Sequence, residues 1–226
     1  MTTNLLFAIK LGIQHFSTIA VLFTLPLLLF QVIATKKLNF VRIGMCFLFL
    51  FYMICAYSLI IFPLPDVAKA ATLSGHDAQL IPFHFIADII RETPFQLGNI
   101  HTYLPALLDN AVLQVIFNII MTVPFGMFLS YYFGLNAKKV VTFSFLLSLF
   151  FELTQLSGLY FMFPGSYRLF DVDDLMANTL GGFVGYQLVG LCKGWLPKLE
   201  NFDILLKKRK VYHKTVSYTH LRAHET

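Results

Sequence analysis

The stretch RLFDVDDLMANTLGGFVGYQLVGLC (residues 168–192) places four charged side chains directly before a long run that carries no charge. The charged residues are Arg168, Asp171, Asp173 and Asp174. A charge-free apolar run of this length is typical of a helix in a lipid bilayer. The stretch therefore predicts a membrane helix with a polar entrance, and that entrance is the first candidate for a functional site.

The composition of the whole chain extends this interpretation. Of the 226 residues, 57% are apolar and 13% are charged, with a mean hydropathy of +0.70, whereas a soluble domain carries about 25% charged residues. A bilayer core about 30 Å thick requires roughly 20 apolar residues per helix. Glu152 is the only charge in the five runs of sufficient length, which are 16–34, 43–62, 111–135, 140–163 and 175–192. We therefore predict an all-α polytopic membrane bundle of five helices.

Basic residues flank these runs on alternate sides. Lysine and arginine follow the first, third and fifth runs, at 36–42, 138–139 and 193–210, whereas acidic residues outnumber basic ones after the second and fourth. Because basic residues gather in cytoplasmic loops, the pattern predicts an N-terminus outside the membrane and a C-terminus in the cytoplasm. The same asymmetry accounts for the net charge of +5, so no nucleic-acid partner is expected.

One long connection, residues 63–110, separates the second and third runs. Its five prolines exclude a long helix, and its apolar segment LIPFHFIADII (80–90) is too short to cross a bilayer. Three interpretations stay open for this segment, namely an interfacial helix, a re-entrant piece, or a lid packed over the bundle. No internal repeat or flexible linker divides the sequence, so we expect a single domain.

The ends of the chain are expected to be additions to this domain. We divide the chain into an N-terminal part, residues 1–40, which contains the first span; a membrane domain, residues 41–196; and a basic cytoplasmic tail, residues 197–215. The last segment, VSYTHLRAHET (216–226), matches residue for residue the translation of a transposase-type sequencing adapter. We therefore expect residues 216–226 to be a disordered artefact and exclude them from the functional argument.

Polar and small residues recur at helical spacing within the last three runs. They are Gln114, Asn118, Thr122 and Gly126 in the third run; Ser144, Ser148, Glu152 and Gln155 in the fourth; and Asp174, Asn178, Gly181, Gly182 and Gly185 in the fifth. Because polar groups avoid lipid, we expect the three stripes to face one another. The glycines and serines are interpreted first as packing residues, and Pro124 as a helix kink.

Glu152 is the residue within a span for which a functional role is favoured. It lies about 16 Å from the outer end of its predicted helix, where a carboxyl must be neutral or paired. Arg168 is the nearest basic residue on that side, and Gln155 could bridge the two. Asp171 as N-cap and Asp174 in the first turn would satisfy free N–H groups at the start of the fifth helix. Capping does not explain Arg168, because the positive end of the helix dipole disfavours a cation. Arg168, Asp171 and Asp174 are therefore interpreted as a charge network that closes a polar pocket.

These motifs together resemble the VanZ-like family of bacterial membrane proteins. The resemblance rests on IPF (81–83), NIIMTVPFG (118–126), FELTQ (151–155) and RLFDVDDLMANTLGGFVG (168–185). It implies that the motif positions of this chain are Asn118, Pro124, Gly126, Glu152, Gln155, Arg168, Asp171, Asp174, Asn178 and Gly182. The founding member raises tolerance to the glycopeptide teicoplanin, so the resemblance implies a multi-pass protein of the bacterial cytoplasmic membrane with a role in the cell envelope.

Three functions stay open at this point. The first and preferred one is a non-catalytic protein whose outward pocket, roofed by 80–90, binds a lipid-linked wall precursor or another anionic lipid through Arg168. The second is a membrane enzyme acting on a lipid or glycan with Glu152 as general acid or base. The third is a proton-coupled transporter or flippase that titrates Glu152. No cofactor is expected, a metal on Asp171 and Asp174 is not favoured because such aspartates are more often caps, and the oligomeric state is open.

Overall fold

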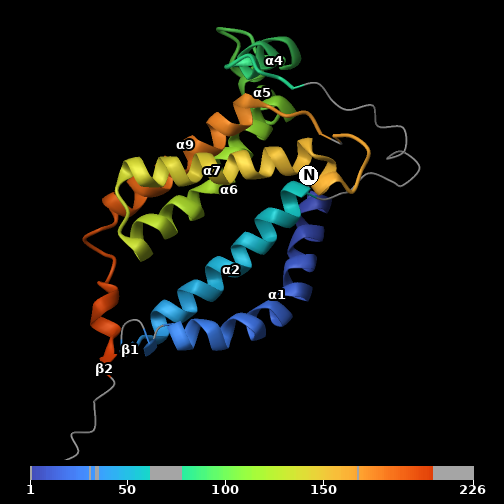
Figure 1. Ribbon diagram of the computed structural model, residues 1–226. Coiled ribbons are helices and arrows are strands. Elements are labelled where there is room, and N and C mark those ends of the chain that lie inside the picture. The colour runs from blue at the N-terminus through green and yellow to red at the C-terminus, as the bar shows by residue number, and fades with distance from the viewer. Residues whose placement is uncertain (1, 31, 34–35, 62–77, 167, 206–226) are drawn as a thin grey trace, which may run out of the picture.

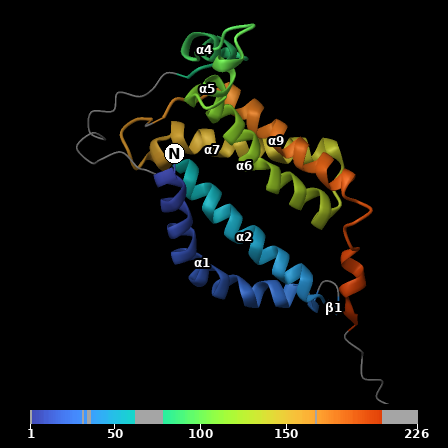
Figure 2. The same cartoon turned by 180° about the vertical axis from the view of Figure 1, so that it is seen from behind.

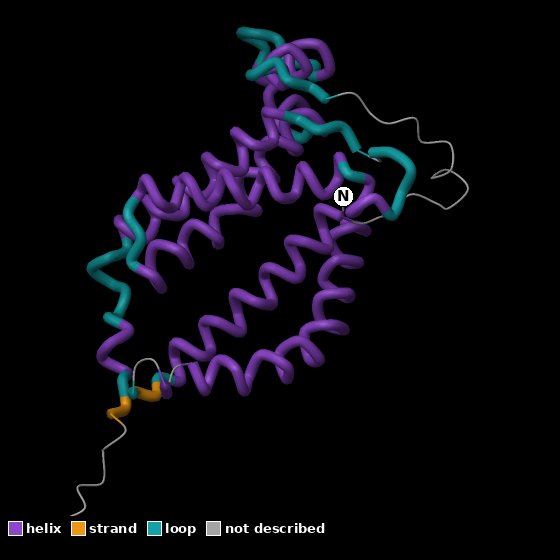
Figure 3. The backbone as a smooth tube through the Cα atoms, viewed as in Figure 1, coloured by secondary structure: helices purple, strands orange, loops and turns teal. Residues whose placement is uncertain are grey.

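The computed structural model describes residues 2–30, 32–33, 36–61, 78–166 and 168–205 (Figure 1). In chain order its elements are α1 (Thr2–Phe30), β1 (Lys37–Leu38), α2 (Phe40–Ile61), α4 (His84–Glu92), the 3-10 turn η2 (Ile100–Thr102), α5 (Tyr103–Leu107), α6 (Asn110–Phe133), α7 (Ala137–Leu156), α8 (Gly158–Phe161), α9 (Val172–Leu191), η3 (Leu199–Phe202) and β2 (Ile204–Leu205). Within these residues strand is confined to β1 and β2 (Figure 3). The segment 216–226 lies outside the described residues.

The prediction of an all-α membrane bundle is confirmed. Of the described helices, α1 (over residues 13–30), α2, α6 and α7 are long and apolar enough to cross a bilayer. α9 is as long as α7 at 20 residues, but its first turn holds two aspartates and its interior is rich in glycine. α9 is not among the four described helices that meet the length and composition of a span, so the count of five spans stays a prediction.

The fourth run ends as a helix earlier than predicted. α7 stops at Leu156, seven residues before the expected end at 163, because the chain enters a left-handed turn. Gly158, Leu159 and Tyr160 have φ angles of 61°, 55° and 58°, and a right-handed helix cannot pass through residues in this region. The connection to α9 therefore begins closer to the middle of the bundle than the sequence suggested.

Helix α9 packs against both α6 and α7 along its length (Figure 2). α6 and α9 run in the same direction. The side-chain amide of Asn118 donates to Asp174 Oδ1 at 2.5 Å, and one turn further on the hydroxyl of Thr122 donates to the backbone carbonyl of Asn178 at 2.7 Å. Both pairs are separated by 56 positions, so the two helices advance together in one register.

α7 lies on α9 in the opposite direction. The amide of Asn178 donates to the hydroxyl of Ser148 at 2.9 Å, and one turn further along α9 Gly182 lies against Ser144, which precedes Ser148 by four residues. The three polar stripes therefore face one another, with the stripe of α9 in the middle. This is the arrangement that their helical spacing predicts.

Glycine brings these helices into backbone contact. A β-carbon on Gly126 of α6 would lie 2.0 Å from the carbonyl oxygen of Gly182, and one on Gly185 would lie 2.2 Å from the carbonyl oxygen of Val123. Non-bonded heavy atoms are most stable at about 3.5–4.0 Å, so a larger residue at either position has to displace a helix. The glycines of α9 are therefore packing residues, as in other close contacts between membrane helices.

Helices α1 and α2 form a hairpin beside this three-helix core (Figure 1). α2 reaches α6 through the stacked rings of Phe49 and Phe128, whose centroids are 3.8 Å apart. One turn along, the hydroxyl of Tyr52 donates to the backbone carbonyl of Met121 at 2.7 Å. The hairpin is therefore joined to the core through α2, by aromatic stacking and a hydrogen bond to the α6 backbone.

The start of α2 is fastened to the C-terminal segment by a cluster that we call the clasp, formed by residues 37–42 and 199–205. β1 pairs antiparallel with β2, and Lys37 Nζ lies 2.9 Å from Asp203 Oδ2. The amide of Asn39 donates to Asp203 at 2.8 Å and to the carbonyl of Leu199 at 2.7 Å. Two segments that the charge pattern assigns to one side of the membrane are thus in contact, while the assignment of that side to the cytoplasm stays a prediction.

Gly126→Ala is expected to destabilise the bundle by about 3 kcal/mol, because overpacking a closed interface displaces a helix. Gly190→Ala is the matched control, since nothing lies within 4 Å of a β-carbon there. It is expected to be neutral or to stabilise α9 by up to about 1 kcal/mol. Thermal unfolding of the detergent-solubilised variants measures both effects, and equal melting temperatures would contradict the packing.

The clasp is expected to weaken at low pH. Hydrogen bonds from Lys37 and then Asn39 lower the pKa of Asp203 below its ordinary value. A lowered pKa in the folded state adds stability above the unfolded pKa of about 3.9, and this stability is lost as the pH falls through the folded pKa. The melting temperature of the wild type should therefore exceed that of Asp203→Ala at pH 7, and the gap should close as the pH falls below the unfolded pKa and through the lowered folded pKa. A gap that does not change with pH would show that the carboxylate contributes nothing to the clasp.

Candidate functional site

A cavity of about 790 Å³ lies between α2, α6, α7 and the start of α9. Its polar wall is formed by Asn110, Gln114, Asn118, Glu152, Gln155, Arg168, Asp171, Asp174 and Asn178. Its apolar wall includes Leu113, Phe117, Met121 and Phe151. Leu59 and Ile60 contribute the last turn of α2, whereas the clasp lies at the first turn of that helix. The cavity is therefore at the opposite end of the bundle from the clasp.

Glu152 lies near the end of α7 and forms part of the cavity wall. The residue is 4% exposed, and its Oε2 accepts the backbone N–H of Asp171 at 3.2 Å. Because α7 ends at Leu156, Glu152 is only about 6 Å from the helix end. The predicted depth of about 16 Å is therefore wrong, since it assumed a helix that continues beyond the left-handed turn.

The three aspartates of the DVDD stretch have three different partners. Asp171 is the N-cap of α9, and its Oδ1 accepts the N–H of Asp173 at 2.8 Å. Asp174 accepts from the amide of Asn118 and so ties α9 to α6. Asp173 instead accepts the backbone N–H groups of residues 83 and 85, at 2.6 and 2.8 Å, where α4 begins. Burial raises the pKa of the Asp171 carboxyl above its ordinary value.

Arg168 lies exposed at the mouth of the cavity and binds the end of α2. Its Nη1 donates to the backbone carbonyl of Ile60 at 3.1 Å, and Gln155 Nε2 donates to the same oxygen at 3.0 Å. The last carbonyls of a helix lack intrahelical donors and form the negative end of the helix dipole, so a guanidinium stabilises them. Among the described residues Arg168 forms no ion pair. The predicted charge network with Asp171 and Asp174 is therefore not built from direct pairs.

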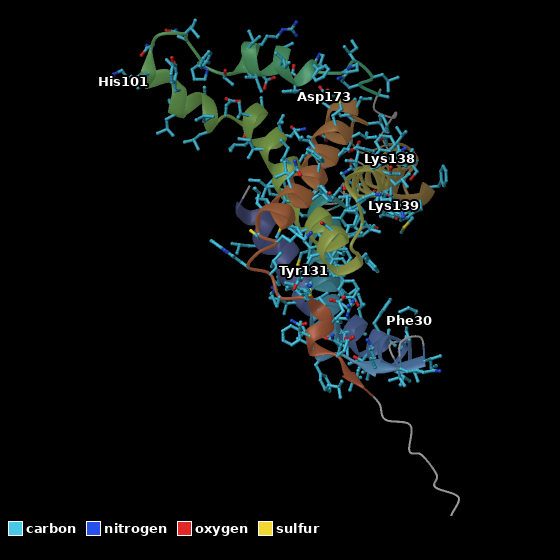
Figure 4. The ribbon with its side chains drawn as sticks, turned by 90° about the vertical axis from the view of Figure 1, so that its left-hand side faces the viewer. Phe30, His101, Tyr131, Lys138, Lys139 and Asp173 are labelled. Carbon is cyan, nitrogen blue, oxygen red and sulfur yellow. The ribbon has the colours of Figure 1, made fainter. Side chains whose placement is uncertain are left out.

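The segment before α4 is attached to the start of α9. Gln79 and Asp171 form a parallel β-bridge, in which the N–H of Gln79 donates to the carbonyl of Phe170 at 2.8 Å. Asp173 then holds the first turn of α4, and Figure 4 shows this residue at the N-terminal end of α9 beside that helix. Asp173 therefore holds the segment that contains α4 and does not serve the cavity.

α4 exposes an apolar stripe and leaves the cavity uncovered. Phe83, Ile86 and Ile90 recur at i, i+3 and i+7 and are 55%, 46% and 74% exposed. An amphipathic helix with an exposed apolar face is typical of a membrane interface, which favours the interfacial interpretation. None of residues 78–92 lines the cavity, so the expected roof is absent from the described part of this segment.

Asn178 lies furthest along α9 among the cavity-lining residues. It is 4% exposed, and its side-chain nitrogen donates to Ser148. Its Oδ1 has no hydrogen-bond partner among the described residues. Less than 1 Å² of this oxygen is accessible, so it is one of the few unsatisfied buried acceptors that folded proteins retain and not a contact for a ligand in the cavity.

The motif positions divide into two groups. The seven that line the cavity are Asn118, Glu152, Gln155, Arg168, Asp171, Asp174 and Asn178. Gly126 and Gly182 form the contact between α6 and α9, and Pro124 lies within α6 with its side chain exposed. In the described chain no group of three or more His, Cys, Asp or Glu side chains could hold a metal ion. The site role of these residues stays a prediction, which their shared cavity supports.

Two residues of this region were missed by sequence reasoning. The sequence assigns Asp173 no role of its own. Capping explains only one or two of the three aspartates, and the aspartate left over was the signal that one of them binds elsewhere. Ile60 contributes through its backbone carbonyl alone, so its side chain carries no signal. Asp173 joins the start of α4 to α9, and Ile60 joins the end of α2 to Gln155 and Arg168.

The family model described as VanZ/LLP1 matches residues 49–193. This range contains all of the residues that line the cavity. A search of curated proteins and a search of solved structures returned no significant match.

Asp173→Ala is expected to release α4 from α9, because two backbone N–H groups lose their acceptor. Loss of an N-terminal cap costs about 1–2 kcal/mol locally. Hydrogen exchange of residues 79–92 should therefore become about 5- to 30-fold faster. Asp88→Ala is the matched control, since Asp88 lies within α4 and its ion pair in the described part of the chain is with His84. Protection of residues 79–92 that is equal in the two variants would contradict the role assigned to Asp173.

Proposed function

The chain belongs to the VanZ/LLP1 family, and on this basis we propose that it is a bacterial envelope membrane protein whose polar cavity binds a lipid head group. The ligand is a lipid-linked wall precursor or another anionic lipid. The observation that carries the proposal is the cavity, whose wall joins polar groups to an apolar surface. Mixed walls of this kind fit amphiphilic ligands, and its volume is within the usual range of about 300–1,000 Å³ for small-molecule sites.

Arg168 is the residue proposed to bind the phosphate. Its side chain is exposed at the mouth, and among the described residues its hydrogen bond runs from Nη1 to the carbonyl of Ile60. A guanidinium carries five N–H donors, so several stay available to a phosphate oxygen. Arginine binds phosphate through paired, charge-assisted hydrogen bonds, which supports this role.

The place of the cavity supports an action at the outer face of the membrane. It lies at the end of the bundle away from the clasp, whose Lys37 and Arg42 belong to a basic flank. With the basic flanks in the cytoplasm, the cavity opens outward, where glycopeptides meet wall precursors. Binding there alters the exposure of the precursor, which is the proposed route to teicoplanin tolerance.

A membrane enzyme acting on the same head group is the second candidate. Glu152 favours it, since this residue places a buried carboxyl in the cavity wall, the setting in which general acids and bases work. Glu152→Gln separates the two candidates. An enzyme should keep its bound lipid and lose tolerance, whereas in a binding protein the bound lipid and tolerance should fall together.

Lipids that co-purify with the detergent-solubilised protein, without residues 216–226, provide the test. One lipid species should be enriched over the bulk membrane in the wild type. Arg168→Ala should reduce its occupancy about 10- to 100-fold, because a charge-assisted contact is worth about 1.5–3 kcal/mol. Arg91→Ala is the control, since Arg91 is exposed and outside the cavity.

Mass spectrometry of the extracted lipids, together with teicoplanin tolerance of expressing cells, provides the readout. Bulk phospholipid in equal amounts in the wild type and in both arginine variants would refute the proposal. Tolerance that follows lipid occupancy through the series would support it.

A further inference from the structure

Helix α2 changes its neighbour along its length. The half that begins at the clasp is joined to α6, where the hydroxyl of Tyr52 donates to the α6 backbone at 2.7 Å. Beyond this residue α2 contacts α7, and the ring centroids of Tyr57 and Phe151 are 6.5 Å apart. In the last turn of α2 the carbonyl of Ile60 accepts from Gln155 of α7 at 3.0 Å. α2 therefore crosses from α6 towards α7 as it approaches the level of the cavity.

The cavity occupies the space that this crossing leaves between α2 and α6. Leu59 lines it from the last turn of α2, and Leu113 and Phe117 line it from the first turns of α6. α1 packs on α2 through the edge-to-face rings of Phe16 and Phe51, and none of its described residues lines the cavity. The side of the cavity between α2 and α6 is therefore apolar.

The lipid-facing surface of α6 continues into the cavity wall. Three pairs of residues follow one another around this helix, roughly 60–100° apart at 3.6 residues per turn. They are Ile116 and Ile120, then the cavity-lining Leu113 and Phe117, and then the polar Gln114 and Asn118. The first pair is 38% and 61% exposed, and exposed apolar side chains of a membrane-spanning helix face lipid. On α6 a continuous apolar surface therefore leads from the bilayer to the polar wall.

Hydrocarbon fits this apolar side better than water does. Apolar cavities stay dry, because water in them lacks hydrogen-bond partners. The stripe from Leu113 to Met121 is about 12 Å long, close to the half-thickness of about 15 Å of a bilayer core. A lipid tail lying along this stripe can run beside the tails of the surrounding leaflet, while its head group stays at the polar wall.

We infer that the ligand enters sideways from the bilayer, between α2 and α6, and that Leu59, Leu113 and Phe117 bind its hydrocarbon tail. We call these three residues the portal. The inference rests on the proposed function, since it takes the head group to lie at Arg168. It narrows the ligand to a lipid that stays anchored in the membrane while it is bound, because a soluble head group makes no contact with the portal.

Tryptophan fluorescence in lipid nanodiscs tests the portal on the purified chain. Trp195 is the one tryptophan of the sequence, and it is replaced by phenylalanine so that Phe117→Trp reports from the portal alone. Ile120→Trp in the same background is the matched control, since it reports from the lipid-facing surface three residues further along α6. Leu113→Trp provides a second portal position if Phe117→Trp does not fold.

Nanodiscs of phosphatidylcholine with brominated tails show where the cavity opens. Bromine quenches tryptophan on contact, so the fluorescence of Phe117→Trp should be quenched to a degree comparable with that of Ile120→Trp. Quenching of Phe117→Trp by acrylamide in the water, without quenching by bromine, would show that the cavity opens to water alone and would overturn the portal.

Unbrominated anionic lipids added to the same nanodiscs identify the occupant. Phosphatidic acid and undecaprenyl phosphate are added separately. At about 5 mol%, a lipid preferred about 10-fold over phosphatidylcholine should restore roughly a third of the fluorescence lost in Phe117→Trp, with little change in Ile120→Trp. The lipid that restores more identifies the source of the head group. Arg168→Ala should abolish the restoration and leave the quenching by brominated phosphatidylcholine intact.

The outcomes separate the portal from the function on which it rests. Bromine quenching of Phe117→Trp that neither anionic lipid relieves leaves the portal standing and contradicts the proposed head-group site. Absence of bromine quenching in both portal variants overturns the portal, whereas the proposed function is then decided by the co-purified lipids. Restoration of equal size in Ile120→Trp would reflect dilution of the brominated lipid and would contradict binding at the portal.

Discussion

Backbone contact between α9 and its neighbours is the constraint on which the rest of the structure depends. Gly126 and Gly182 approach so closely that a single added methyl group would collide with a carbonyl oxygen. A contact of this kind permits one register, because a shift along the helix replaces glycine by a larger residue. That register aligns Asn118 with Asp174 and Thr122 with Asn178, and so assembles the polar wall.

The same contact explains why the cavity has an inner end. Along α9 the residues facing the neighbours change from Asp174 through Asn178 to Gly182. Larger polar side chains keep the helices apart near the entrance, and glycine lets them close further in. The close helix contact at Gly182 therefore ends the cavity, which begins where Asp174 and Asn178 hold the helices apart. Packing residues and cavity residues of the motif occupy successive turns of the same helices.

The facing of the stripes could be predicted from the sequence, because spacing of three to four residues and the cost of polar groups in lipid leave few alternatives. The end of α7 could not be predicted from the sequence. Gly158 signals a turn, but the positive φ of Leu159 and Tyr160 contradicts what those residues favour on their own. The partner of Arg168 was also beyond local reasoning, since it is a backbone oxygen 108 positions away.

The distant pairing in the clasp bears on how the chain is made. Lys37 and Asp203 are 166 residues apart, and Tyr52 is 69 residues from the carbonyl to which it donates. Synthesis runs from the N-terminus, so the α1–α2 hairpin enters the bilayer before either partner exists. During that interval the Tyr52 hydroxyl depends on water, head groups or the insertion machinery for its hydrogen bond. The hairpin is thus the first part of the bundle to be made and the last to be fastened.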